Sequence, residues 1–469
     1  MATRSVATPL VAALLAAALA VTACSQESPD PVPRPGIEPS FVHGTDGSDV
    51  DRIAAATVTD AQRYWQDRFP RDFGKPWHDL DGGAYSVDTT DVDGVSPPCS
   101  GSSDEIEGNA YYCGSVDAIA WDRSALLPVL REHYGDTAVV AVLAHEIGHA
   151  VQQRTDRSQQ GTANTQGSAS QDRSIRTEAM ADCYAGSFAR SVADGRSEHL
   201  RTDPAQLDSA LRALITFRDP VGTAQATTDA HGSAFDRVSA FQDGYRGGPT
   251  QCAGVGDETA KLTGAGGADQ QAAGDGQAAR DGQAAGRGQA PANGNAAGEP
   301  ASAESARAFF ARLTAERGAA WTPPPLRPAA DVDPERCPGA NAPAAYCARP
   351  PAVLADRGAL AELRRDAGEQ APETLLASRY ALAAQSALRL PLEGADAGRR
   401  TTCLTGAYTG SLRSPAGSLG PGDLDGAVSA LLSEDGVSRD VAGSNALSGF
   451  DRVAEFRKGL FGGGSACGV

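Results

Sequence analysis

Two histidines and a glutamate stand close together in the segment AVLAHEIGHAVQQR, residues 141–154. In a helix, His145 and His149 lie one turn apart on the same face, so both imidazoles can bind one Zn²⁺ ion. Glu146 then lies beside the metal and can take a proton from a water bound there. A catalytic zinc also needs a third protein ligand and one open position. The motif therefore predicts a zinc-dependent hydrolase.

The third ligand is expected from the segment RTEAMADCYAG, residues 176–186. Glu178 supplies a carboxylate for the metal, and Asp182 follows one helical turn later on the same face. Asp182 suits a supporting position, in which it accepts the free N–H of a ligand histidine and fixes the ring. Gly148 costs helix stability but permits close approach of another segment. This wider pattern favours a zinc site over a chance occurrence of HExxH.

The alternative interpretation is a pair of surface histidines on an amphipathic helix. The motif is preceded by AVVAVLA and followed by AV, so this helix is apolar nearly all round. Two histidines and a glutamate buried there need partners, because unpaired buried polar groups are costly. A bound metal supplies such a partner.

A further donor near the zinc is a candidate on weaker grounds. His231, in the segment DAHGSAF, could stabilise the oxyanion of a tetrahedral intermediate, or it could hold a turn at Gly232. Tyr184 could donate in the same way, although residues of its type are usually packed and half-buried.

Helical periodicity predicts most of the elements that position these residues. The histidine motif lies in a predicted helix over 136–154, with Asp136 or Thr137 as its N-cap. We expect a mainly α fold with a small β part, of the α+β class. Strands are expected near 84–88 and 110–120, and other helices over 54–69, 124–135, 174–195 and 204–217.

Four segments of the first half are similar to a known family. They read YYCGSVDAIAWD, YGDTAVVAVLAHEIGHAVQQR, EAMADCYAG and HGSAFDRVSAFQDGYRGGPTQC, and lie within roughly residues 60–252. In them the chain resembles the bacterial neutral zinc metallopeptidases, relatives of the gluzincin peptidases. The resemblance implies a zincin-like fold, a Zn²⁺ cofactor and a protein or peptide substrate. It also implies that His145, His149 and Glu178 are zinc ligands. Glu146 would be the catalytic base, and Asp182 would be the carboxylate that supports a ligand histidine.

The N-terminus has the pattern of an export signal. Arg4 precedes the apolar run PLVAALLAAALAVTAC, which is too short for a spanning helix and fits a secretory h-region. Its end, VTAC, resembles the lipobox of bacterial lipoproteins. That resemblance implies cleavage after residues 1–23, lipidation of Cys24, and a flexible tether over 24–49 that leads from the membrane to the first domain. The alternative is an ordinary signal peptide with an incidental cysteine.

A low-complexity segment divides the rest of the chain. Residues 253–303 repeat DGQAA and contain almost no apolar side chain larger than alanine, so they cannot form a core and predict a linker. The domains are then expected at 50–252 and 304–469. The net charge of −18 argues against a nucleic-acid partner, which rewards clustered Lys and Arg.

The second domain is expected to be a degenerate copy of the first. Phe235–Cys252 aligns without gaps onto Phe450–Cys467, and LAHEIGHAVQ aligns with LASRYALAAQ. The copy loses every proposed zinc residue, so we expect it to be non-catalytic. The replacements in this alignment are Ser378 for His145, Arg379 for Glu146, Leu382 for His149, Thr402 for Glu178, Gly406 for Asp182 and Ala446 for His231.

Besides Cys24, the chain has eight cysteines, an even number that favours disulfides outside the cytosol. Each copy has two cysteines in its first part, one in a later predicted helix and one at its end. The duplication therefore predicts the pairs Cys99–Cys113, Cys183–Cys252, Cys337–Cys347 and Cys403–Cys467.

Two functional hypotheses follow from the sequence. The first is a lipid-anchored, extracytoplasmic zinc peptidase, with Glu146 as general base and the second domain as an intramolecular partner. The second is a surface-anchored interaction protein whose zinc site is structural or vestigial. An open metal position over a cleft would favour the first hypothesis.

Overall fold

The computed structural model describes residues 37, 39–91, 93–94, 96–155, 168–216, 233–255, 301–332, 337–412, 419, 421–433 and 435–469. The predicted signal peptide, Cys24, His231 and nearly all of the predicted linker lie outside them. The described part is mainly helical with two small sheets, as the sequence predicts. We call residues 39–255 the first lobe and residues 301–469 the second lobe. Among the described residues, no helix is both long enough and apolar enough to span a bilayer.

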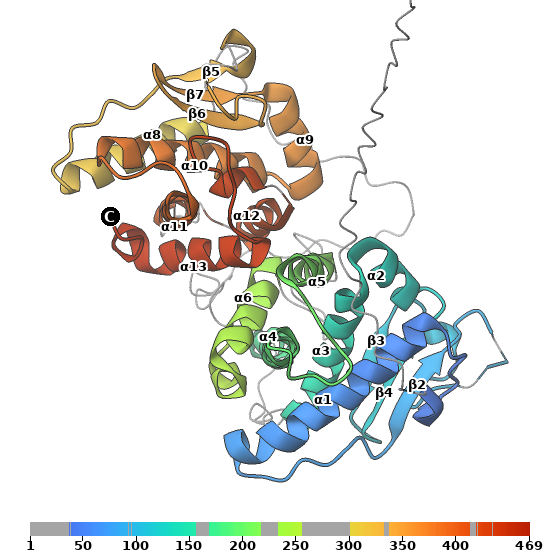
Figure 1. Ribbon diagram of the computed structural model, residues 1–469. Coiled ribbons are helices and arrows are strands. Elements are labelled where there is room, and N and C mark those ends of the chain that lie inside the picture. The colour runs from blue at the N-terminus through green and yellow to red at the C-terminus, as the bar shows by residue number, and fades with distance from the viewer. Residues whose placement is uncertain are drawn as a thin grey trace, which may run out of the picture. The chain divides into compact units, whose positions relative to one another are not determined.

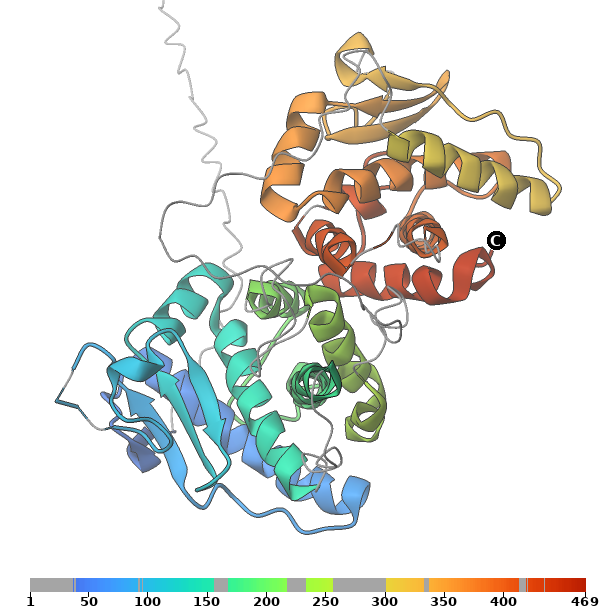
Figure 2. The ribbon, with the colours of Figure 1, turned by 180° about the vertical axis from the view of Figure 1, so that it is seen from behind.

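The first lobe packs helices against a four-stranded sheet of order β1-β2-β4-β3 (Figure 1). β3 is antiparallel to β4, and the other pairs are parallel. Seen from behind, the sheet lies in front of α1 and α3, which share its far face (Figure 2). Its elements are β1 (Val42–His43), α1 (Asp49–Phe73), β2 (Gly83–Val87), β3 (Ala110–Cys113), β4 (Ala118–Asp122), α2 (Leu126–Tyr134), α3 (Asp136–Arg154), α4 (Ser168–Ala193), α5 (Pro204–Thr216) and α6 (Ala234–Gly247).

Two details differ from the sequence prediction. β1 lies inside the segment expected to be a tether, because Val42 and His43 pair with β2 and so order the chain before α1. The N-cap of α3 is Gly135 at φ 79°, with no side-chain cap, rather than Asp136 or Thr137. A positive φ suits glycine, and this turn lets α2 and α3 follow each other directly.

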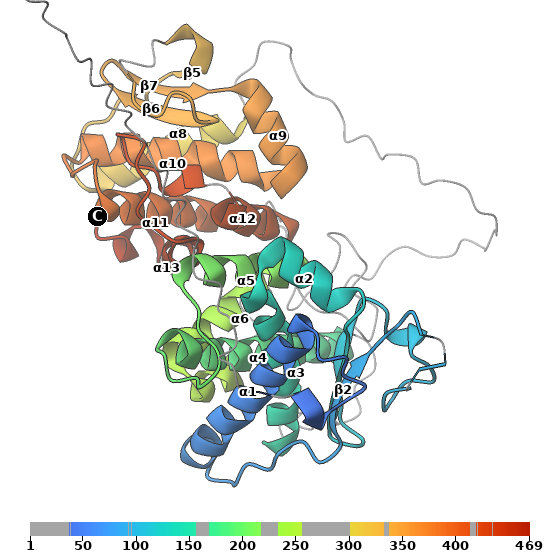
Figure 3. The same cartoon turned by 45° about the vertical axis from the view of Figure 1, so that its right-hand side comes forward.

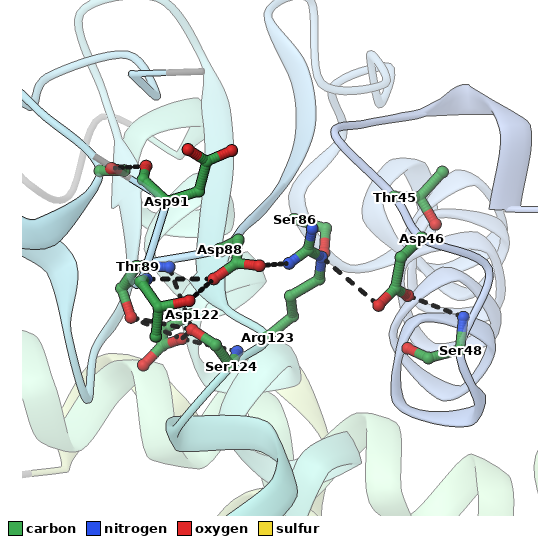
Figure 4. Close-up of polar contacts among 12 residues, drawn as sticks. Thr45, Asp46, Ser48, Ser86, Asp88, Thr89, Asp91, Asp122, Arg123 and Ser124 are labelled. Carbon is green, nitrogen blue, oxygen red and sulfur yellow. Dashed lines mark hydrogen bonds and ion pairs between the residues drawn. The ribbon is translucent and has the colours of Figure 1, made fainter. Parts of the chain in front are cut away.

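Carboxylates hold the junctions between the sheet and the helices (Figure 4). Asp122, at the end of β4, is buried and accepts the N–H groups of Ser124, Ala125 and Leu126 where α2 begins. Arg123 forms an ion pair of 3.1 Å with Asp88, which follows β2. These contacts fix the ends of β2 and β4 and the start of α2.

Helices α3 and α4 approach closely at Gly148. This residue has no side chain, and Ala181 of α4 occupies the space where a Cβ would project. The close approach expected from the sequence is therefore present, and it brings the polar residues of α3 and α4 within reach of one another.

Replacing Gly148 by alanine is expected to destabilise the first lobe. The new Cβ would lie 2.8 Å from the carbonyl oxygen and 2.9 Å from the Cα of Ala181, which are backbone atoms that cannot rotate away. Overpacking of this kind costs about 1–3 kcal/mol. Thermal unfolding measures the loss, and Gly254→Ala is the control because its Cβ would meet nothing within 4 Å. Equal melting temperatures for the two variants would contradict the argument.

Apart from β1, which has no counterpart among the described residues, the second lobe repeats the order of helices and strands and the strand pairing of the first. Its sheet has the order β5-β7-β6, with β5 parallel and β6 antiparallel to β7, as β2 and β3 are to β4. Figure 3 shows its layers, with the sheet above α8 and α10 and the later helices below. Its elements are α8 (Ala301–Glu316), β5 (Leu326–Pro328), β6 (Ala344–Ala348), β7 (Pro351–Ala355), α9 (Arg357–Ala367), α10 (Gln370–Ala387), α11 (Ala395–Ser411), α12 (Pro421–Ser433) and α13 (Gly449–Ala466).

The packing of α11 corrects part of the sequence alignment. In the first lobe, Gly186 of α4 lies against the carbonyl oxygen of Phe241; in the second, Gly406 of α11 lies against that of Phe456. Phe241 and Phe456 are matched residues, so Gly406 corresponds to Gly186. The alignment that placed Thr402 at the position of Glu178 and Gly406 at that of Asp182 is therefore displaced by one helical turn, because both helices repeat small residues at that spacing.

The corrected register changes two of the proposed replacements. Glu178 and Asp182 correspond to Gly398 and Thr402, not to Thr402 and Gly406. Neither replacement carries a carboxylate, so the second lobe still lacks an acidic group at both positions.

Four disulfide bonds form among the described residues. They join the cysteine pairs expected from the sequence, namely Cys99–Cys113, Cys183–Cys252, Cys337–Cys347 and Cys403–Cys467.

Candidate metal centre

Three side chains from α3 and α4 converge on one point in the first lobe. His145 Nε2 lies 3.2 Å from His149 Nε2 and 3.2 Å from a carboxylate oxygen of Glu178. The other oxygen of Glu178 lies 3.6 Å from His149 Nε2. Among the described residues, these three form the one group of histidine, cysteine or acidic side chains arranged to hold a metal ion.

The spacing of these atoms fits tetrahedral zinc. With bonds of about 2.0–2.1 Å, neighbouring ligand atoms of a tetrahedral site lie about 3.3–3.4 Å apart. The two Nε2 atoms lie 3.2 Å apart, and His145 Nε2 lies 3.2 Å from one oxygen of Glu178, both close to that value, while the other oxygen lies 3.6 Å from His149 Nε2. Two imidazoles and a carboxylate are also a donor set that suits zinc.

The ring nitrogens that face away from this point are both hydrogen-bonded. His145 Nδ1 donates to Asp182 over 2.8 Å, and Asp182 is fully buried. His149 Nδ1 lies 3.2 Å from the amide oxygen of Gln152. These contacts orient each ring so that its Nε2 atom is left for the metal. Asp182 therefore occupies the supporting position that the sequence suggests.

Arg237 of α6 completes the support of His145. Its guanidinium donates from Nε to one oxygen of Asp182 over 2.8 Å and from Nη2 to the other over 3.0 Å. Both side chains are buried, and such a two-point contact fixes orientation as well as charge. A chain of contacts thus runs from α6 through α4 to a candidate ligand on α3.

Glu146 faces the same site without belonging to the ligand group. It is 8% exposed, and a cavity of about 610 Å³ adjoins it and the three candidate ligands. Burial raises the pKa of Glu146 to about 7, and the attraction of His145 opposes this increase. A carboxylate with a pKa near neutrality is suited to taking up and releasing a proton.

The three candidate ligands respond differently to this environment. Burial alone would lower the pKa of His145, but the negative Asp182 outweighs it and raises that pKa to about 10. Burial lowers the pKa of His149. The histidines hold the pKa of Glu178 at about 2, against the effect of burial. Without metal, a proton on His145 therefore balances the two acidic groups beside it.

Zinc binding is expected to strengthen as the pH rises. Zinc needs a neutral imidazole, so it must displace the proton that His145 keeps below a pKa of about 10. One proton released per ion corresponds to about a tenfold increase in the apparent association constant per pH unit between pH 7 and 9. Competition with a chelator at a series of pH values measures this slope.

Asp182→Asn is the matched variant for this measurement. It removes the negative charge that raises the pKa of His145, so the slope is expected to flatten. The affinity is also expected to fall by about 10- to 100-fold, as for other partners of ligand histidines. A slope near zero for the unchanged protein would contradict the protonation of His145.

Of the two residues suggested as oxyanion donors, the structure places one, Tyr184, and it lies away from the candidate metal centre. His231 lies outside the described residues. Tyr184 is 1% exposed, and its ring packs edge-on against Trp65 and Phe73. Tyr184 therefore belongs to the aromatic core.

Three residues at the site were not identified from the sequence. They are Arg237, Gln152 and Tyr112, whose backbone N–H lowers the pKa of Glu146 by hydrogen bonding. Arg237 lies in FDRV, which recurs in the second half, and Gln152 is matched by Gln385. Because Arg237 and Gln152 have counterparts in the second half, where the proposed zinc residues are lost, the sequence did not indicate that they belong to a metal site.

At the equivalent point in the second lobe, the described residues form no metal-binding group. Ser378 donates to the backbone of Leu375, and Arg379 donates to backbone oxygens of Gly436 and Val437. Leu382 is fully buried. The described residues therefore fill this position with packing and backbone contacts.

Comparison with known proteins agrees with this geometry. Residues 33–255 match the family described as "Putative neutral zinc metallopeptidase", a segment that contains the whole candidate metal centre. The chain is 31% identical over 178 residues to uncharacterized proteins of Mycobacterium bovis and Mycobacterium tuberculosis. The match covers 34% of this chain and 58% of each relative, so the chain spans little more than half of their length. No solved structure matches the chain.

Proposed function

We propose that the first lobe is a zinc-dependent endopeptidase with Glu146 as its general base. The observation that carries the proposal is the triangle of His145, His149 and Glu178, which has zinc spacing and opens onto a cavity next to a buried carboxylate. The family match of residues 33–255 supports the same class of reaction.

Different residues of the chain have different roles in the proposed hydrolysis. Bound zinc supplies a Lewis acid, which lowers the pKa of a water and polarises a carbonyl oxygen. Glu146 takes a proton from the attacking water and passes it to the leaving amine. Asp182 and Arg237 keep the ring of His145 in place, and Gln152 does the same for His149.

A peptide suits the shape of the cleft. The cavity is lined along one side by Ala110, Tyr111 and Tyr112 of β3, the edge strand of the sheet. An extended peptide can add to an exposed sheet edge through main-chain hydrogen bonds. Leu126 and Leu214 also line the cavity and would contact apolar side chains of a substrate. These features favour a peptide over a small polar ester or amide.

The open cavity also distinguishes a catalytic zinc site from a structural zinc site. A structural zinc site is closed by four protein ligands, whereas a catalytic site keeps one position free. The described residues offer three ligands and a cavity, so they support the catalytic alternative.

The second lobe is, in this proposal, a degenerate copy without chemistry. The repeated element order, the repeated strand pairing and the matched disulfides support a common origin of the two lobes. The loss of every metal-binding group at the equivalent point supports a non-catalytic role.

We also propose that the protein acts on the extracytoplasmic face of a membrane, held by lipid on Cys24. The lipobox-like sequence before Cys24 and the even number of other cysteines support this location. Radiolabelled palmitate incorporated into the expressed chain, and its loss in Cys24→Ala, would test the anchor. Incorporation that persists in Cys24→Ala would contradict it.

A peptide-library cleavage assay with the purified protein tests the function itself. Cleavage should require stoichiometric zinc, stop on addition of a chelator and return when zinc is restored. Cleavage that survives complete removal of zinc would exclude a metal-dependent mechanism. Zinc that binds without any cleavage would favour the interaction protein.

A further inference from the structure

We propose that the second lobe holds the metal centre of the first lobe in its working arrangement, through Asp425. This inference rests on the proposed zinc site. It assigns the second lobe a positioning role rather than a substrate or a second active site.

The same kind of contact, from an aspartate to a helix N-terminus, is made by each lobe to the other. Asp425 of α12 accepts the backbone N–H of Phe235, in the first turn of α6, over 3.1 Å. Asp208 of α5 accepts the backbone N–H of Phe450, in the first turn of α13, over 2.7 Å. Asp208 and Asp425 are matched residues of PAQLD and PGDLD, and Phe235 and Phe450 are matched in FDRV. The contact is therefore reciprocal.

Each aspartate acts at a helix N-terminus. The first backbone N–H groups of a helix have no partner within the helix, and a negative charge there is favourable. Phe235 is fully buried and Asp425 is 4% exposed, so neither group can exchange this contact for bulk water. Asp425 thereby fixes the first turn of α6.

That turn carries Arg237. The guanidinium of Arg237 binds both oxygens of Asp182, and Asp182 accepts the Nδ1–H of His145. A continuous series of hydrogen bonds and one helical turn thus joins Asp425 in the second lobe to a zinc ligand in the first. Further along α6, Gln242 donates to the carbonyl of Phe450 over 2.7 Å, so the second lobe holds this helix at more than one point.

The contact in the opposite direction has no such consequence. Asp208 fixes α13, whose Arg452 is matched with Arg237. Arg452 donates to the carbonyls of Leu431 and Leu447, and Thr402 stands where Asp182 would be. Asp208 and Asp425 therefore form a matched pair in one interface, of which one supports the metal centre and the other does not.

Full-length variants Asp425→Ala, Asp425→Asn and Asp208→Ala test the proposal. Asp425→Ala is expected to weaken zinc binding by about tenfold, the low end for partners beyond the ligands. Asp425→Asn keeps an acceptor oxygen and is expected to restore most of that affinity. Asp208→Ala loosens the same interface and is expected to leave zinc affinity within twofold of the unchanged protein. Chelator competition measures all three.

A second measurement uses metal-free protein. Hydrogen exchange in the first turn of α6, and exchange of the Nδ1 proton of His145 followed by NMR with labelled histidine, should both quicken in Asp425→Ala. Asp208→Ala should instead quicken exchange in the first turn of α13. Equal effects of Asp425→Ala and Asp208→Ala on His145, or none from either, would overturn the proposal. An unchanged protein that binds no zinc would overturn the proposed function, while the exchange data would still decide the link from Asp425 to His145.

Discussion

Glutamine in place of Glu146 is expected to lower kcat for peptide hydrolysis by about 10³-fold, within the range that a general base contributes. The amide of glutamine fills the same space but cannot take the proton of the attacking water. Glu146 lies outside the group of His145, His149 and Glu178, so the zinc content should stay at one ion per chain. Steady-state kinetics together with metal analysis measures both quantities.

The stability of Glu146→Gln provides the control. Burial raises the pKa of Glu146 above its ordinary value, so the ionised carboxylate disfavours the folded state at pH values above about 7. A neutral glutamine removes that cost, and the variant should be at least as stable as the unchanged protein at pH 8. Activity within tenfold of the unchanged enzyme would show that another group is the base. A lower melting temperature would attribute lost activity to unfolding.

Methionine in place of Arg237 is expected to lower the free energy of unfolding of the metal-free protein by about 3 kcal/mol, at the lower end for breaking a buried ion pair. The substitution leaves the buried Asp182 with His145 as its remaining charged partner among the contacts described above. Urea denaturation followed by tryptophan fluorescence reports mainly on the first lobe, because Trp65, Trp77 and Trp121 all lie in it.

Two further variants separate charge from packing. In Asp182→Asn the buried group is neutral, so adding Arg237→Met to it should cost much less than adding Arg237→Met to the unchanged protein. Arg452→Met, in the second lobe, removes the matched arginine, whose guanidinium donates to the backbone carbonyls of Leu431 and Leu447. Additive losses in the double variant, or an equal loss in Arg452→Met, would show that Arg237 acts by packing alone.

The sequence was sufficient to predict which side chains meet at the candidate metal centre. Helical spacing places His145 and His149 on one face, and the same rule places Glu178 and Asp182 together on another helix. Both are local patterns, and the structure brings these four side chains together. Gly148 signalled the close contact of α3 with α4 because glycine inside a helix needs a packing reason.

The parts that could not be predicted depend on contacts distant in sequence. Arg237 reaches Asp182 only because α6 packs against α4. An arginine also stands at the matching position in the second half, Arg452, so the sequence gave no reason to assign Arg237 to the metal centre. The strand β1 has two residues, too few for a periodic signal, and exists through its pairing with β2. The register of α11 was displaced by one turn because repeated small residues align equally well in either position.

The bond between Cys183 and Cys252 adds a topological property to the metal centre. Cys183 directly follows Asp182, and Cys252 follows α6, so the bond joins two residues with a sequence separation of 69 and closes a covalent ring that contains α5 and α6. Any opening of the lobe that separates α6 from α4 must stretch this ring. Because of this covalent link, Arg237 keeps a high effective concentration near Asp182 while the lobe is open. The contact between them therefore forms again as an intramolecular step.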